Sequence, residues 1–240
     1  MKALVWCVNV NRIKTIGAAL LLTATLMQSG TAHASGISLG ATRVIYPEHA
    51  KATSLPVANT SPDTRFLVQS WVEDKNGKKT SDFIITPPLF VSKSKSENAL
   101  RIMYVGKPLP TDRESVYWLN AKSIPEIDTD KTEGKNTLQL AILTRIKIFV
   151  RPEKLNSNVD EAPAQLRFKR SGQSLIISNP TPFYINIVKL SVGGAPLANT
   201  MVPPKGEVRV ENKAARPGPV QFSTINDFGG VTPVQKGVEI

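Results

Sequence analysis

The longest regular pattern of hydrophobic and polar positions in the chain lies at residues 137–150. Every second side chain from Leu138 onward is apolar apart from Thr144, whereas the intervening positions are mixed and include Arg145 and Lys147. Strict alternation is typical of a β-strand whose two faces have different surroundings. A helix is the alternative, but Arg145 interrupts its apolar stripe, and the second half is rich in β-branched residues. We therefore expect one strand of about 45 Å, part of whose apolar face needs a partner.

Shorter alternating runs, separated by proline and glycine turn signals, predict strands along the rest of the chain. The expected strands are residues 37–46, 55–59, 66–73, 83–86, 89–91, 99–105, 115–124, 166–169, 174–178, 183–192, 208–211 and 222–225. Asn76-Gly77 is a hairpin signal after the third of these, and Ser171-Gly172 is expected to join the runs on either side of it as a pair. The spacing of the first seven strands indicates an immunoglobulin-like sandwich.

The segment 153–163 is the strongest linker signal, because it is polar, bounded by prolines and without an apolar period. We therefore expect an N-terminal immunoglobulin-like domain at 35–156 and a smaller C-terminal β-sandwich at 157–240. A length of about 200 residues is enough for two domains of this size.

Residues 1–34 have the composition of a secretory signal. Basic residues precede an apolar run at 16–27, and Ala32-His33-Ala34 has the small-x-small form of a signal-peptidase site. A membrane anchor is the alternative, but the run is short for a bilayer span. We expect cleavage after Ala34. The only cysteine, Cys7, is then lost, so that the mature chain must rely on burial rather than on disulfides.

Charge and residue types narrow the function classes. Removing Lys2, Arg12 and Lys14 with the signal lowers the net charge from +11 to +8. The remaining cations are scattered, with no cluster of aromatic and basic residues of the kind that binds nucleic acid, and no other apolar run is long enough for membrane insertion.

Catalytic chemistry has few candidates in the mature chain. The mature chain has no cysteine and only one histidine, His49, so a cysteine nucleophile and a Cys/His zinc site are excluded. Phosphate-binding glycine loops and hydrolase motifs are also missing from the sequence. Carboxylate pairs could act as acid and base, but such pairs occur in any soluble protein. We expect no catalytic residue, metal or cofactor.

Arg43 is unusual because it lies inside an otherwise apolar strand. Two interpretations stay open for it: a strand residue that faces solvent, or a cation that is retained for a ligand.

Eight blocks of sequence together resemble the periplasmic pilus (fimbrial) chaperones, PapD/FimC-like. They lie at residues 39–47, 69–73, 86–90, 112–115, 137–142, 145–147, 179–184 and 224–229. Among them are Gln-Ser-Trp-Val-Glu, Asn-Pro-Thr-Pro-Phe-Tyr and Thr-Ile-Asn-Asp-Phe-Gly, and their order covers essentially the whole mature chain. A short loop at 128–136 and the absence of mature cysteines are similar to the short-loop branch of this family.

This resemblance implies an all-β fold of two immunoglobulin-like sandwiches set at an angle, with a cleft between them. In the family, a basic pair in the cleft anchors the C-terminal carboxylate of a pilus subunit, and the matching residues are Arg43 and Lys147. An arginine binds a carboxylate through two parallel hydrogen bonds, while a lysine adds a compact charge.

The resemblance also implies that the long strand is lent to the subunit, whose own sandwich lacks one strand. Chaperone–pilin complexes are known examples of strand addition, so this mechanism is carried over from the family. The matching donor positions are Leu138, Leu140 and Ile142. By contrast, we expect Ile146, Ile148 and Val150 to pack in their own domain. Three further charges match a structural trio between the domains: Glu114, Arg151 and Asp227.

The function implied is a non-enzymatic periplasmic chaperone. It binds pilus subunits, prevents their aggregation and delivers them to an outer-membrane usher for fimbrial assembly. Whether the free chaperone covers its apolar strand by self-association stays open in the sequence. Two rival classes remain: a structural pilus or adhesin-type β-sandwich protein, and an extracytoplasmic enzyme with a carboxylate pair.

Overall fold

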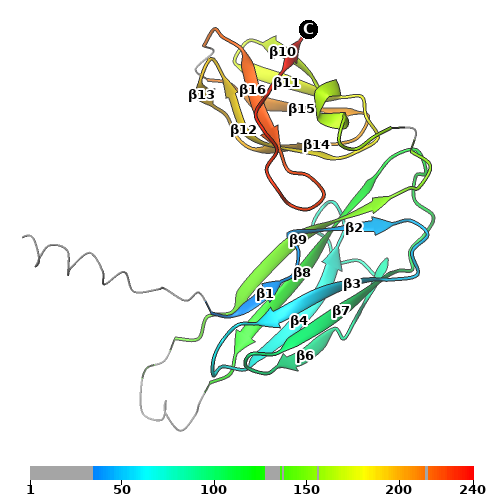
Figure 1. Cartoon of the computed structure of the whole chain (residues 1–240), viewed down its shortest axis with the longest axis vertical. Helices are drawn as coiled ribbons and strands as arrows, with labels where there is room; N and C mark the ends of the chain where they lie inside the picture. Colours follow the sequence, from blue (N-terminus) through cyan, green and yellow to red (C-terminus); the bar gives the residue numbers. More distant parts are fainter. Residues whose placement is uncertain (1–34, 128–135, 137, 156, 214–215) are drawn as a thin grey trace, which may run out of the picture. The chain divides into compact units, whose positions relative to one another are not determined.

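The computed structural model describes residues 35–127, 136, 138–155, 157–213 and 216–240. The expected signal peptide at 1–34 and most of the polar loop before the long strand lie outside these residues. The regular elements of the described chain are all strands apart from one short 3₁₀ helix, and they run from blue to red along the sequence in Figure 1. The predicted all-β class is confirmed. Within the described ranges, no helix is long and apolar enough to cross a membrane.

Nine strands form the first sandwich. They are β1 (Ile37–Leu39), β2 (Arg43–Pro47), β3 (Thr53–Asn59), β4 (Phe66–Glu73), β5 (Phe83–Thr86), β6 (Leu89–Ser92), β7 (Glu97–Tyr104), β8 (Ser115–Pro125) and β9 (Ile142–Arg151). One sheet has the order β1-β3-β7-β5, and the other has the order β2-β9-β8-β4-β6. The two sheets bury a common core between them, which makes this half of the chain an immunoglobulin-like sandwich.

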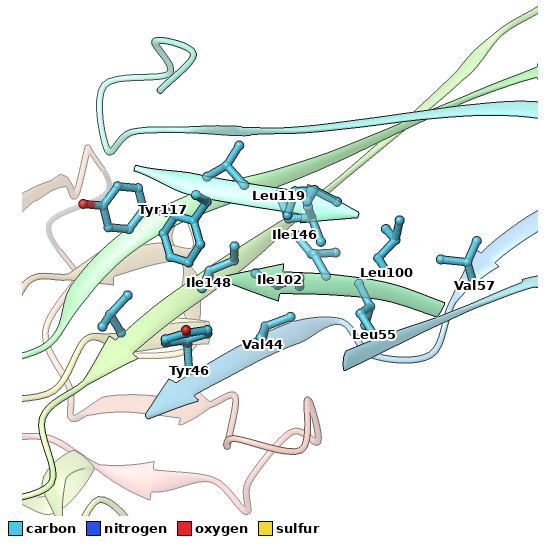
Figure 2. Close-up of a cluster of buried hydrophobic side chains, with 14 residues drawn as sticks. Val44, Tyr46, Leu55, Val57, Leu100, Ile102, Tyr117, Leu119, Ile146 and Ile148 are labelled. Carbon is cyan, nitrogen blue, oxygen red and sulfur yellow. The ribbon is translucent and has the colours of Figure 1, made fainter. Parts of the chain in front are cut away.

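The core of the first sandwich follows from the alternation of its strands. Successive side chains of a strand point to opposite faces, so one apolar set from each sheet points inward. Figure 2 shows these side chains, among which Tyr46, Leu119 and Ile102 are fully or almost fully buried. Ile146, Ile148 and Val150 belong to this core, which confirms the expectation that they pack in their own domain.

The second sandwich follows the short 3₁₀ helix η1 (Ala162–Gln165). Its strands are β10 (Arg167–Ser171), β11 (Ser174–Asn179), β12 (Ile185–Val192), β13 (Ala195–Pro196), β14 (Thr200–Val202), β15 (Gly206–Glu211), β16 (Val220–Thr224), β17 (Gln235–Lys236) and β18 (Val238–Glu239). The sheets have the orders β15-β11-β10-β18 and β13-β12-β16-β17, with β14 also paired to β12. Strands β10 and β11 form the hairpin expected around Ser171-Gly172.

The long strand begins later than the sequence predicts. The expected run of 137–150 becomes β9 at Ile142–Arg151, and Thr137 lies outside the described residues. A strand needs a hydrogen-bonding neighbour, and the last pair between β8 and β9 is Ser123 with Ile142. Strand β8 ends at Pro125, whose carbonyl accepts a hydrogen bond of 2.7 Å from the side chain of Gln139. Residues 138–141 therefore continue without a ladder.

The first expected strand divides into two. Strand β1 pairs with β3 in one sheet, and β2 pairs with β9 in the other. The chain changes sheets at 40–42, where a Cβ on Gly40 would meet Pro56 at 3.0 Å. This crossing brings Arg43 beside the long strand.

The prediction of a hairpin at Asn76-Gly77 is wrong in one respect, because the strands on either side of the turn do not pair with each other. The turn forms, but it closes only a single bridge between Glu73 and Lys79. Strand β4 then pairs with β6 and β8, while β5 pairs with β7 in the opposite sheet. A turn signal specifies local geometry and not the sheet that the next strand joins.

Candidate functional site

The parallel pairing of β2 with β9 brings two cations together. Arg43 is the register partner of Lys147, and Pro47 is the partner of Arg151. The neighbours Val44 and Ile148 point into the core, so Arg43 and Lys147 lie on the outer face of the sheet. Residues that are distant in the sequence thus present two adjacent positive charges.

Arg43 is partly buried and has no acidic partner in its hydrogen bonds. Its Nη1 donates to the carbonyl of Ile225 in the second sandwich at 3.1 Å, and its guanidinium lies 5.7 Å from the ring centre of Phe149. Its Nε is buried without a partner among the described residues. Burial lowers the pKa of Arg43 despite the opposing charges of Asp227 and Glu114.

Lys147, like Arg43, donates a hydrogen bond to a neutral oxygen. Its Nζ donates to Oδ1 of Asn186 at 2.6 Å and lies 5.2 Å from the ring centre of Trp118. Burial lowers the pKa of Lys147, and the charge of Arg43 lowers it further. No ion pair of either cation occurs within the described part of the chain. Two half-buried cations without a counter-ion form a site that favours an anion, because an unpaired buried charge is unfavourable.

Arg151, at the end of β9, has the opposite surroundings. Its Nε donates to Glu114 at 2.6 Å, and its Nη1 and Nη2 donate to the two carboxylate oxygens of Asp227 at 2.6 and 2.9 Å. Glu114 is only 3% exposed and also accepts a hydrogen bond of 2.8 Å from the backbone N–H of Tyr184. These contacts join the first sandwich to the second.

The electrostatics of this trio follow from its burial and its bonds. Burial on its own would lower the pKa of Arg151, but hydrogen bonds and charge from Asp227 and Glu114 outweigh it and raise the pKa. Burial raises the pKa of Glu114, and Arg151 only partly opposes that shift. The structure therefore brings together all three residues of the predicted trio.

The segment that precedes β9 exposes apolar side chains at alternate positions. Leu138 is 84% exposed, Leu140 66% and Ile142 57%. Exposed leucine or isoleucine side chains are ordinary one at a time, but three in register on one segment form a continuous apolar surface.

One edge of β9 is also open over its first half. Strand β8 pairs with β9 from Ile142 to Val150, whereas β2 pairs only with Lys147–Arg151 on the other side. No other described strand pairs along Ile142–Ile146 on that side. Unpaired backbone N–H and C=O groups at such an edge form a template for an added strand.

The sequence did not identify two side chains that hold this site. Asn186 is a polar residue within an apolar run, which was a visible signal, but its partner lies in the other sandwich. Trp118 contacts two cations, because Arg145 also packs over its ring, 4.2 Å from the ring centre. The pairing of β8 with β9 places Trp118 beside Lys147.

Comparisons with known proteins assign the chain to a family. Residues 36–156 match the model of the pili and flagellar-assembly chaperone PapD N-terminal domain, and residues 161–236 match that of the pili assembly chaperone PapD C-terminal domain. The chain belongs to this family of pilus-assembly chaperones.

Individual relatives agree with that assignment. The probable fimbrial chaperone SfmC of Escherichia coli K12 is 48% identical over 218 residues, covering 90% of this chain and 95% of the relative. The chaperone protein FimC of the same strain is 46% identical over 222 residues, covering 92% and 91%.

Solved structures are similar as well. The crystal structure of the periplasmic chaperone SfaE has 43% identity and a TM-score of 0.75, covering 85% of this chain and 100% of that one. A chain from the Salmonella enterica SafA pilin in complex with the SafB chaperone has 31% identity and a TM-score of 0.78, covering 87% and 98%.

Proposed function

We propose that this chaperone binds pilus subunits in the periplasm by two connected contacts. Residues 138–142 are donated to the subunit as a strand, and Arg43 with Lys147 binds the subunit's C-terminal carboxylate. The single observation that carries the proposal is the continuity of these features: the exposed apolar segment runs into an open strand edge, which runs into two cations without a counter-ion.

The anchor follows from the chemistry of the two cations. A carboxylate can accept from the guanidinium of Arg43 and the ammonium of Lys147 at once, and charge-assisted hydrogen bonds are stronger than neutral ones. Both cations have lowered pKa values because of their burial, so an incoming negative charge removes an unfavourable interaction.

The donated strand follows from the exposed segment. Leu138, Leu140 and Ile142 point to one side if the segment extends, and each is worth about 1.5–3 kcal/mol when it is fully buried, before the costs of ordering are subtracted. The open edge of β9 supplies the backbone groups for the new ladder. Binding of the subunit's carboxylate at Lys147 would fix the register in which the donated strand pairs with the subunit. The same part of the subunit groove would then lie opposite these three side chains in every complex.

The other roles follow from the same scheme. Glu114, Arg151 and Asp227 are structural and hold the two domains, 35–156 and 157–240, in contact. Residues 1–34 are removed on export, after Ala34. The protein acts without catalysis or a cofactor and delivers subunits to an outer-membrane usher.

The test is co-expression with the pilus subunits encoded beside its gene, followed by recovery of complexes. Leu140→Glu places a charge in the donated face and should reduce recovery strongly. Leu143→Glu is the matched control, because Leu143 is similarly exposed at 53% but lies on the other face of the strand. Equal recovery with both variants would contradict donation by this face, and undiminished recovery with Arg43→Ala and Lys147→Ala would contradict the anchor.

A further inference from the structure

Asn186 lies on β12 of the second sandwich, yet its side chain contacts the first. Its Oδ1 accepts the hydrogen bond of 2.6 Å from Lys147, and the residue is only 5% exposed. Lysine has three N–H donors and no acceptor. The bond to Asn186 therefore fixes the direction of one N–H of Lys147 and leaves two for a ligand.

The backbone of the same residue is connected to the other cation. The carbonyl of Asn186 accepts from the N–H of Ile225 at 3.0 Å, and the carbonyl of Ile225 accepts from Arg43 at 3.1 Å. One pair of neighbouring residues, at the end of the β12–β16 ladder, thus supplies an oxygen to each cation. The second sandwich holds Arg43 and Lys147 in a fixed mutual position.

The amide of Asn186 is satisfied at only one end. Because Lys147 can only donate, Oδ1 must face it, and Nδ2 then points elsewhere; it is buried and has no partner among the described residues. A buried N–H group without an acceptor is unfavourable for folding. An asparagine with this arrangement contributes little to the stability of the second sandwich, which points to a role at Lys147.

We propose that Asn186 is a positioning residue of the carboxylate anchor. Its amide oxygen directs the ammonium of Lys147 toward the subunit's terminal carboxylate, so that the anchor is built by both sandwiches rather than by the first alone. This inference rests on the proposed function, since it assumes that the carboxylate binds at Arg43 and Lys147.

The test compares two synthetic peptides that carry the C-terminal sequence of a pilus subunit, one with a free carboxylate and one with a terminal amide. Their affinities are measured for the mature chain and for Asn186→Ala. The wild type should prefer the free acid, and Asn186→Ala should lower that preference by about tenfold, as for the loss of one hydrogen bond that orients a charged group. The melting temperature should not fall.

Two further variants complete the design. Asn212→Ala is the matched control, because Asn212 is also a buried asparagine of the second sandwich with an unpartnered side-chain atom; it should keep the full preference. Asn186→Asp places a carboxylate against Lys147 inside the protein, and it should lower the affinity for the free acid below that of Asn186→Ala. This variant also keeps the inference testable if Asn186→Ala folds poorly.

The pH dependence gives a readout that a structural role would not change. Lys147 faces Arg43 on β2, the ring of Trp118 on β8 and the amide of Asn186 on β12. An acceptor stabilises the ammonium, so its loss should move the alkaline decline in affinity to a lower pH.

The outcomes separate the two claims. A wild type that binds acid and amide equally would overturn the anchor and this inference with it. A wild-type preference that Asn186→Ala retains in full, with an unchanged pH profile, would overturn the role of Asn186 alone.

Discussion

Two cationic sites on the same strand are held in opposite ways. On β9, Arg151 binds two carboxylates through three hydrogen bonds, whereas Lys147, four residues earlier, binds only an amide oxygen. Both lie beside β2 and both contact the second sandwich. At the first site the protein supplies the counter-ions of Arg151 itself. At the second site, Arg43 and Lys147 form no ion pair within the described part of the chain.

The two sites differ in whether the buried cation has counter-ions. A buried cation with its counter-ions in place resists change, because removing either partner leaves a charge uncompensated. A buried cation without one gains from any anion that reaches it. Desolvation of charge therefore makes Arg151 depend on its two carboxylates, and under the proposed function it favours the binding of an anion at Lys147.

The largest expected effect on stability comes from removing Arg151. Arg151→Ala leaves Glu114 buried without its cation, and we expect the free energy of unfolding to fall by about 3 kcal/mol or more. Denaturant titration followed by tryptophan fluorescence measures it. Arg145→Ala is the control on the same strand, because Arg145 forms a more exposed ion pair with Glu73 at 2.8 Å; it should cost less than about 1 kcal/mol. Equal losses would remove the distinction between a buried and an exposed pair.

Removal of the cation at the second site, Lys147, should not lower the stability. Lys147→Ala removes a half-buried cation that has no counter-ion and faces Arg43, so the melting temperature should stay the same or rise. The affinity for a pilus subunit should fall by about a hundredfold, as for the loss of a charge-assisted hydrogen bond. Calorimetry and a binding titration on the same sample measure both. A clear loss of stability would mean that Lys147 has a structural role like that of Arg151.

The affinity for a subunit should fall at alkaline pH, because Lys147 loses its proton there. A carboxylate is attracted to the protonated ammonium, and burial lowers the pKa of Lys147 below its usual value of 10.5. As the pH rises through that lowered pKa, the proton is lost and the affinity should fall. Lys147→Arg keeps its charge at these pH values, because a guanidinium titrates above about 12, and should give a flatter profile. The same decline in that variant would assign it to another group.

Much of the fold could be predicted from the sequence, because alternating runs mark the strands directly. Strands β4 and β5 have the predicted bounds. The strands that were missed, β13, β14, β17 and β18, have two or three residues, which is too short for an alternation to be visible. The predicted start of β9 was wrong because the pattern of apolar residues does not show where the neighbouring strand ends.

The site was harder to predict for a related reason. Arg43 stood out inside an apolar strand, but only the parallel register places Lys147 beside it. Glu114 reads as a surface charge in the sequence, and its burial depends on Arg151 and on the N–H of Tyr184. Asn186 contacts Lys147 across two sandwiches, and no local pattern encodes that contact.

The smallest effect should come from an ion pair that also joins the two sandwiches but lies in water. Asp112 accepts from Lys205 at 2.7 Å and from Arg113 at 2.9 Å, and hydrogen bonds from Arg113 and then Lys205 lower its pKa. Its side chain is well exposed, so solvent and salt screen the attraction. Asp112→Ala should leave the melting temperature unchanged within error, at low and at high salt. A loss as large as that of Arg151→Ala would show that contact between the sandwiches, rather than burial of the charge, determines the stability.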